Sequence, residues 1–249
     1  MDSNRTIAVA QGAPGMSADR KAAIWIGVLY IIGTVVLILS AVVTNGVLTG
    51  PAYMAQVAAQ PNRLALGALL VLLAGFSIAM VPVVFWPVGR RYNETLAMGY
   101  VVFRGALEGV LYIVLALCWL LLNALSTQPD AAPLADFVRT AQVVISDQLI
   151  AIPFALGALM FSYLLYQSRL VPRWLSVWGL VGAALYLVPS LGSMFGLSLG
   201  ILMAPTAVQE MVMAAWLIAK GFSPAAPAAD PVSETSGRQA AASGTASAA

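Results

Sequence analysis

The chain has 249 residues, of which 61% are hydrophobic and only 9% are charged. Soluble domains carry roughly a quarter charged residues, so this composition excludes an ordinary soluble protein and predicts an all-α integral membrane protein. The formal net charge of +2 gives no support for nucleic-acid binding. The chain contains no histidine and one cysteine, Cys118. These absences exclude His-ligated haem, most zinc and copper sites, Ser-His and Cys-His catalytic pairs and an intrachain disulfide.

Six apolar runs are long enough to cross a membrane as helices. The hydrocarbon layer is about 30 Å thick and a helix rises about 1.5 Å per residue, so roughly 20 apolar residues suffice. The runs cover residues 22–43, 64–86, 96–122, 149–166, 175–195 and 199–219. Together they predict one transmembrane domain of six helices over residues 21–222. Proline inside four of the runs predicts kinks, at Pro82, Pro153, Pro189 and Pro205.

Both ends of the chain differ in composition from the apolar domain. Residues 1–20 are polar or small, and we expect a flexible cytoplasmic segment there. Because Met16 precedes the first run, residues 1–15 are either a dispensable leader or the result of a misassigned start. Residues 223–249 are rich in Ala, Ser, Pro and Gly and are predicted to form a disordered cytoplasmic tail.

The lysines and arginines of the short connections predict the orientation in the membrane. Positively charged residues accumulate in cytoplasmic loops. With the N-terminus inside, only Arg63 and Arg139 fall on the outer side. The cytoplasmic segments then hold Arg5, Arg20, Lys21, Arg90, Arg91, Arg169, Arg173, Lys220 and Arg238. Both termini are therefore predicted to face the cytoplasm.

The outer connection after the third run has a helical pattern of its own. Leu134, Phe137 and Val138 fall on one helical face, while Arg139 lies off that face. We favour a helix that lies flat on the outer leaflet. The alternatives are an extension of the fourth span and a lid over an outward-facing cavity.

Ionisable side chains inside apolar runs are the main chemical clue in the chain. Arg104 and Glu108 lie in the third run and Glu210 lies in the sixth. A charge in hydrocarbon costs about 3 kcal/mol on insertion scales, so such residues usually pair and face the protein interior. In the third run Tyr100 and Tyr112 extend the pattern, because all four residues recur every four positions. We predict that they share one helical stripe.

A pair of small residues lies beside this stripe. Gly105 and Gly109 are separated by three residues, the spacing that lets another helix backbone approach closely. We predict that they form a helix-packing notch, so that the third helix faces protein on a broad front.

Helix rise predicts which charged residues meet. Arg104 lies about 16 Å from the cytoplasmic end of its helix and Glu210 about 15 Å from that end of its own, so we predict that they are in contact. One arginine cannot neutralise two carboxylates, and burial favours the neutral form, so we expect either Glu108 or Glu210 to be protonated. Gln209 is a further candidate donor. The predicted buried polar cluster or ligand site comprises Tyr100, Arg104, Glu108, Tyr112, Gln209 and Glu210.

Several catalytic chemistries lack the residues they need. No aspartate lies inside a predicted span, as an intramembrane aspartyl protease would require. Lys21 and Lys220 lie at the interfaces, where neither can form a buried Ser-Lys dyad. Two buried glutamates without histidine or a third acid make a poor metal cage. We therefore predict no catalytic residue, no cofactor and no metal ligand.

Several stretches of the chain resemble a bacterial multi-pass membrane family known as domain of unknown function 4386. They are GVLYIIGTV at 27–35, AMVPVVFWPV at 79–88, NETLAMGYVVFRGALEGVLYIV at 93–114, residues 157–187, and QEMVMAAWLIAKGF at 209–222. The resemblance covers about residues 20–222 and implies residence in the bacterial cytoplasmic (inner) membrane. It places Arg104, Glu108, Gln209, Glu210 and the turn 172–179 in the family pattern. It implies no reaction, because the family has none assigned.

Three functional hypotheses follow. We favour binding or permeation of a small polar or amphiphilic molecule, or of a lipid, at the buried Arg/Glu cluster, since intramembrane charges commonly mark substrate paths. The first alternative is a non-catalytic membrane partner or assembly protein, in which the cluster only locks helix packing. The second is a lipid-modifying membrane enzyme with Glu108 or Glu210 as general acid or base. The lipid bilayer is the expected environment, and homo-oligomers remain open.

Overall fold

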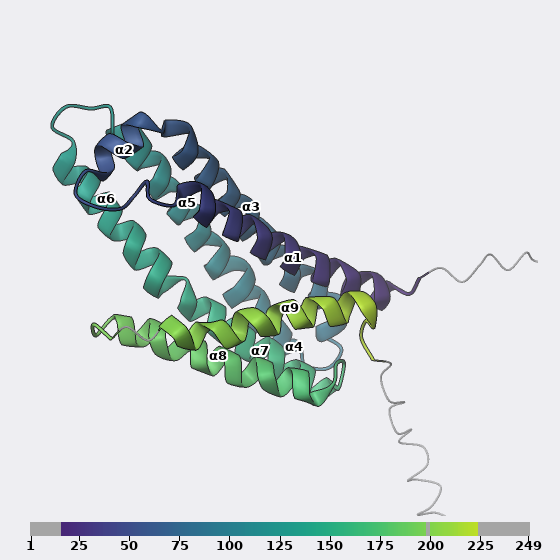
Figure 1. Cartoon of the computed structure of the whole chain (residues 1–249). Coiled ribbons are helices and arrows are strands. Elements are labelled where there is room, and N and C mark those ends of the chain that lie inside the picture. Colours follow the sequence, from purple (N-terminus) through teal and green to yellow (C-terminus); the bar gives the residue numbers. More distant parts are fainter. Residues whose placement is uncertain (1–15, 198–199, 224–249) are drawn as a thin grey trace, which may run out of the picture.

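The computed structural model describes residues 16–197 and 200–223, and these residues contain helices and no strand (Figure 1). The predicted flexible leader, the disordered tail and the predicted start of the sixth run at Leu199 lie wholly or partly outside them. The elements are α1 (Ala18–Thr44), α2 (Tyr53–Ala59), α3 (Pro61–Gly89), α4 (Glu94–Tyr100), η1 (Val101–Leu107), α5 (Glu108–Leu125), α6 (Ala132–Val144), η2 (Ile145–Leu149), α7 (Ala151–Ser168), α8 (Arg173–Ser193), η3 (Gly200–Met203) and α9 (Ala204–Ala219).

Five helical stretches in the described part of the chain are long and apolar enough to cross a membrane. They are Ala18–Thr44, Pro61–Gly89, Glu94–Leu125, Ala132–Ser168 and Arg173–Ser193. The helix α9 is also apolar but has only 16 residues. The all-helical prediction is therefore confirmed, with five candidate spans and a possible sixth.

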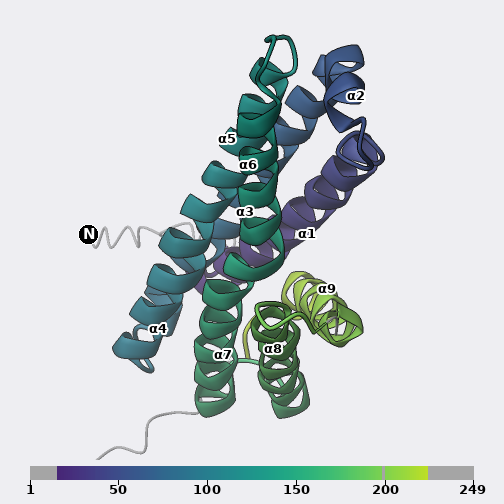
Figure 2. The ribbon, with the colours of Figure 1, turned by 90° about the vertical axis from the view of Figure 1, so that its left-hand side faces the viewer.

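The helices form two groups that meet at one end of the molecule. The helix α1 packs along α3, and α3 packs along α5, while α7, α8 and α9 pack on one another in sequence. Figure 1 shows that α9 lies close to α1 at one end, and that α8 and α9 diverge from α1, α5 and α6 toward the other. In Figure 2 the same division appears from the side, with α7, α8 and α9 gathered at one end.

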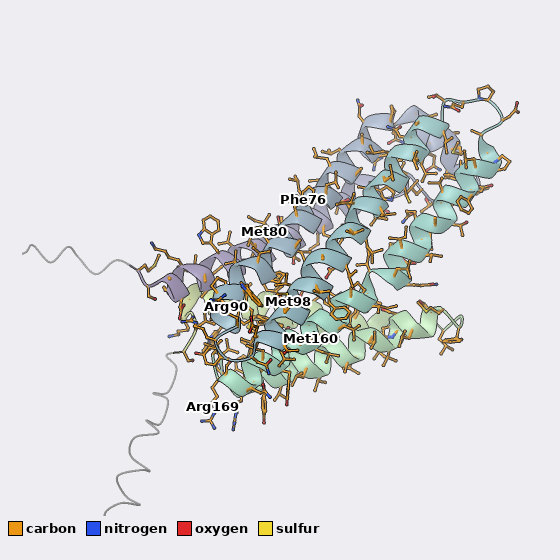
Figure 3. The ribbon with its side chains drawn as sticks, turned by 180° about the vertical axis from the view of Figure 1, so that it is seen from behind. Phe76, Met80, Arg90, Met98, Met160 and Arg169 are labelled. Atoms are coloured by element: carbon orange, nitrogen blue, oxygen red, sulfur yellow. The ribbon has the colours of Figure 1, made fainter. Side chains whose placement is uncertain are left out.

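Lysines and arginines collect at the end where the two groups converge, which we call the basic end. The guanidinium of Arg20 on α1 donates to the carbonyl oxygens of Leu217 (3.0 Å) and Ile218 (2.6 Å), the last turn of α9. Helix C-terminal carbonyls have no intrahelical partner and carry partial negative charge, so this arginine caps α9. The other basic side chains of this end, at helix ends or in the adjoining turns, are Lys21, Arg90, Arg91, Arg169, Arg173 and Lys220. Figure 3 shows Arg90 and Arg169 at this end.

The side of the bundle that faces the viewer in Figure 3 carries exposed apolar side chains. Phe76, Met80 and Met98 are labelled on this side in Figure 3, and they are 54%, 46% and 45% exposed. Side chains of this kind belong in hydrocarbon and not in water, which is the exposure pattern expected of a helix bundle surrounded by lipid.

Two separate apolar cores hold the bundle together. The basic-end core includes Ile26, Phe85, Tyr100, Phe161 and Leu217 from five different helices. The far-end core is built around Leu64, Val71, Tyr112, Trp119 and Leu122. Tyr100 and Tyr112, the two ends of the four-residue pattern, therefore lie in different cores. The residues between them cross from one core to the other.

The helix α6 is not a separate helix that lies flat on the outer leaflet, so that prediction is wrong. It continues through η2 into α7 as one 37-residue stretch. Ala135 and Val138 are buried in contacts with the bundle, and the hydroxyl of Tyr53 on α2 donates to Asp136 at 2.7 Å. These contacts hold α6 upright against α5, so the extension of the fourth span is the correct alternative.

The prolines act in three different ways. Pro82 and Pro189 lie inside α3 and α8, as predicted. Pro153 lies in the first turn of α7, just beyond η2, a π-helical turn in which the N–H of Ile150 donates to the carbonyl of Ile145 at 3.1 Å. A proline cannot donate to the residue four positions back, and the wider turn accommodates that loss. Pro205 lies in the first turn of α9, where a free N–H is not needed, so no kink forms there.

The crossing of α1 and α9 provides a test of the packing. A Cβ on Gly27 would lie 2.6 Å from the carbonyl oxygen of Ala214, closer than real Cβ contacts. We expect Gly27→Ala to lower the free energy of unfolding by about 1–3 kcal/mol, as overpacking does. Gly109→Ala is the control, since its Cβ would meet only Ala79 at 3.4 Å and alanine favours a helix. Thermal unfolding in detergent measures both; equal midpoints for the two variants would contradict this packing.

Candidate functional site

The charged side chains of the third span lie between the two apolar cores. Arg104 is 2% exposed and Glu108 is 1% exposed. The Nη2 atom of Arg104 donates to Oε1 of Glu210 on α9 at 2.8 Å. Its Nη1 atom lies 3.4 Å from Oε2 of Glu108, one turn further along the same helix. The structure thus brings the three ionisable residues together, with the arginine nearer to Glu210.

Aromatic rings enclose the arginine. Its guanidinium carbon lies 4.2 Å from the ring centre of Phe154 on α7 and 5.9 Å from that of Tyr30 on α1. A cation over an aromatic face is attracted by the negative charge density of the ring. The hydroxyls of Tyr30 and Tyr100 share a hydrogen bond of 2.9 Å, and Tyr100 stacks on Phe161 with ring centres 4.6 Å apart. These rings close the site toward the basic end.

A π-helical segment positions the charged stripe. Four residues exceed one α-helical turn of 3.6, so a stripe with period four drifts by about 40° at each step. Between Val101 and Leu107 the helix widens to η1, in which the N–H of Glu108 donates to the carbonyl of Phe103. The wider turn removes much of the drift. As a result Tyr100, Arg104, Glu108 and Tyr112 are all buried.

The polar atoms of the cluster are incompletely paired. Both carboxylate oxygens of Glu108 are buried and accept no hydrogen bond. The Nε and Nη1 atoms of Arg104 also lack a hydrogen-bond partner. A buried polar group without a partner is costly, and charged groups cost more than neutral ones. The site is therefore arranged for more polar contacts than the side chains themselves supply.

A cavity of about 270 Å³ lies directly against the cluster. Arg104, Glu108 and Glu210 supply its charged wall. The other lining residues come from α1, α3, α5, the start of α7, α8 and α9: Thr34, Leu37, Ile38, Ile78, Tyr112, Ile150, Phe154, Tyr186 and Ala207. Ile38 on α1 is 58% exposed, and Ala207 on α9 is exposed as well, so the mouth of the cavity lies between these two helices.

The remaining predicted site residues occupy different places. Tyr112 lines the cavity, and Tyr100 lies behind the arginine in the basic-end core. Gln209 is 5% exposed and faces α8, where a Cβ on Gly179 would lie 3.1 Å from its Nε2 atom. It lines a second cavity of only about 10 Å³, which Glu210 also touches. Gln209 thus lines only the second cavity, whereas Glu210 lies between the two cavities.

The predicted notch packs within the chain. A Cβ on Gly105 would lie 3.3 Å from the Cγ of Pro82, and one on Gly109 would lie 3.4 Å from the Cβ of Ala79. Both contacts are to α3. The two glycines therefore let α3 approach the stretch that carries Arg104.

Sequence reasoning missed three aromatic residues of the site, Tyr30, Phe154 and Tyr186. The two tyrosines could have been recognised from the sequence, because a tyrosine deep in an apolar run, far from the membrane–water interface, needs a polar partner for its hydroxyl. Phe154 could not have been recognised, since nothing distinguishes one apolar residue from the others in an apolar run. Among the described residues, no three Cys, Asp or Glu side chains gather in a way that could hold a metal ion.

The apolar spans and the buried charges define a multi-pass membrane protein. A family model confirms the resemblance noted in the sequence: residues 25–221 match a domain of unknown function, DUF4386. The chain belongs to this family. No curated protein and no solved structure matches it.

The ion pair between Arg104 and Glu210 provides a second test. We expect Arg104→Gln to lower the free energy of unfolding by about 3–5 kcal/mol, because it leaves two buried carboxylates without a cation. Glu210→Gln should cost less, because Arg104 keeps Glu108 as a partner at 3.4 Å. The double variant should lose clearly less than the sum of the two. Chemical denaturation in detergent gives the coupling. Asp19→Asn is the control, since its ion pair with Arg91 is half exposed and worth at most about 1 kcal/mol. Additive losses at residues 104 and 210 would contradict the pairing.

Proposed function

We propose that this protein binds a small polar or amphiphilic molecule in the cavity beside Arg104, Glu108 and Glu210, as a receptor or as part of a permeation path. One observation carries the proposal. Buried charged atoms without hydrogen-bond partners face a cavity of about 270 Å³ whose mouth reaches the surface. A cluster that only locks two helices together needs neither the cavity nor the unpaired atoms.

The cavity has the composition of a ligand site. Most ligand pockets are apolar with a few polar groups that fix orientation. Here Leu37, Ile38, Ile78 and Phe154 supply apolar wall, and the charged groups lie at its inner end. The mouth between α1 and α9 is bordered by apolar side chains, so a molecule with an apolar part can enter from the lipid.

The structure does not leave the glycine notch free for a partner protein, as the assembly alternative would require. Gly105 and Gly109 contact Pro82 and Ala79 of the same chain, so the notch is occupied by α3. The enzyme alternative gains little, because Thr34, the one residue of the cavity lining with an aliphatic hydroxyl, makes no hydrogen bond to Glu108 or Glu210 that would activate it. We therefore keep binding or permeation as the proposed function and treat the other two as the less supported hypotheses.

We also propose that the protein crosses the bacterial cytoplasmic membrane six times with both termini inside. The basic end supports this orientation, because the ends of α1, α3, α7, α8 and α9 that lie there all carry lysine or arginine. At the far end only Arg63 and Arg139 are found among the described residues. The sixth crossing is assigned to η3 and α9 together.

Cysteine labelling tests the orientation. The native Cys118 is first replaced by alanine. We expect Thr127→Cys, between α5 and α6, to react with a membrane-impermeant maleimide in intact cells. Gln167→Cys, an exposed position near the basic end of α7, should react only after permeabilisation. The reverse pattern would overturn the proposed topology, and labelling of both in intact cells would overturn the assignment of the spans.

Blocking the mouth tests the cavity. We expect native mass spectrometry of the purified protein to show a retained small molecule or lipid that is lost from Ala207→Trp, because the new ring fills the mouth. Val208→Trp is the matched control: it is the next residue, is 54% exposed and does not line the cavity. The double variant Arg104→Gln/Glu210→Gln should also lose the molecule. Equal retention by all variants would overturn the proposed function.

A further inference from the structure

The charges around the cavity do not balance. Arg104 carries one positive charge, while Glu108 and Glu210 carry two negative charges when both are ionised. Arg104 is hydrogen-bonded to Glu210 at 2.8 Å and is 3.4 Å from Glu108, whose oxygens accept no hydrogen bond. The unbalanced negative charge therefore resides on Glu108. Uncompensated charge in a water-poor interior is costly, so the site requires one more positive charge.

No other charged group in the described part of the chain can supply it. From the elements packed around Glu108, the titratable or charged groups that face it are Arg104, Glu210, Tyr30, Tyr112 and Tyr186. The three tyrosines are neutral or negative and add no positive charge. The helices α3 and α7 contribute Ile78 and Phe154, which do not titrate, and Asp147 on η2 is exposed. The missing charge has to come from outside the protein.

The cavity indicates what form this charge can take. A volume of about 270 Å³ lies at the lower end of the range of ligand pockets, so the cavity suits a compact ligand. The carboxylate oxygens of Glu108 need N–H or O–H donors. Phe154, Tyr112 and Tyr186 present aromatic surface, which favours a cation, and the aliphatic wall favours an apolar body. A compact amine with a primary or secondary ammonium group meets all of these conditions.

We propose that Glu108 binds one positive charge at a time, either a proton or the ammonium group of a small apolar amine, so that amine binding releases a proton. This inference rests on the proposed function and adds the class of ligand. The exchange is balanced: the protonated carboxyl of Glu108 and the ammonium ion give a carboxylate–ammonium pair and one proton in solution. Arg104 and Glu210 stay paired throughout and hold the wall of the cavity in place.

Calorimetry on the full chain in detergent tests the exchange. The probe is benzylammonium chloride, with benzyl alcohol and sodium benzoate as neutral and anionic compounds of nearly the same shape. We expect only benzylammonium to bind strongly. Its affinity should rise with pH by up to tenfold per unit, the slope for one competing proton. Titrations in buffers of different ionisation enthalpy should show close to one proton released per amine bound.

The variants distinguish this inference from the proposed function. Glu108→Gln should lose benzylammonium binding, while Glu108→Asp should retain it with lower affinity. If Glu108→Gln does not fold, the pH slope and the proton count of the unaltered protein decide the question. Binding of benzyl alcohol or benzoate that is as tight as that of benzylammonium, and that Ala207→Trp abolishes, would overturn the inference and leave the cavity as a binding site. Absence of benzylammonium binding, or binding that does not depend on pH, would overturn the inference as well.

Discussion

A guanidinium held between two carboxylates, with an apolar core on either side, is the constraint on which the rest of this structure depends. The charges of Arg104, Glu108 and Glu210 cannot face lipid, so the third span must turn its two inward and α9 must present Glu210 at the matching depth. Buried ion pairs often cost as much as they contribute to stability, and their best-attested role is to fix a register. Here the ion pairs fix the rotation of the third span about its own axis. The burial of Tyr100 in one core and Tyr112 in the other follows from it.

The widened turn η1 connects this constraint to the local structure. A regular α-helix would carry a four-residue pattern gradually around its surface, and Tyr112 would point about 120° away from Tyr100 after three steps. The π-helical turn compensates for part of this rotation where the charged residues lie. Close approach of Gly157 supports the same segment, because a Cβ there would lie 3.1 Å from the backbone nitrogen of Arg104. The backbone of α7 thus packs directly on the charged turn.

Much of this arrangement could be predicted from the chain alone, and the rest depended on how helices pack. The positions of the spans follow from apolar runs, because the thickness of hydrocarbon sets their length. The depth of Arg104 and Glu210 follows from helix rise, which is why their proximity was predictable. The upright position of α6 was not, since it depends on contacts such as the hydrogen bond from Tyr53 to Asp136. The cavity could not be predicted from the sequence either. Tyr186 and Phe154 line it only because of the way in which α7, α8 and α9 cross.

The shortness of α9 has a consequence for the surrounding lipid. Its 16 residues cover about 24 Å, and the four residues of η3 add about 8 Å, so only the two together match a hydrocarbon layer of about 30 Å. A crossing with so little excess length responds to a thicker bilayer by thinning it locally. Ala207 lies in the first turn of α9. The mouth of the cavity therefore lies at the part of the bundle where such thinning would occur.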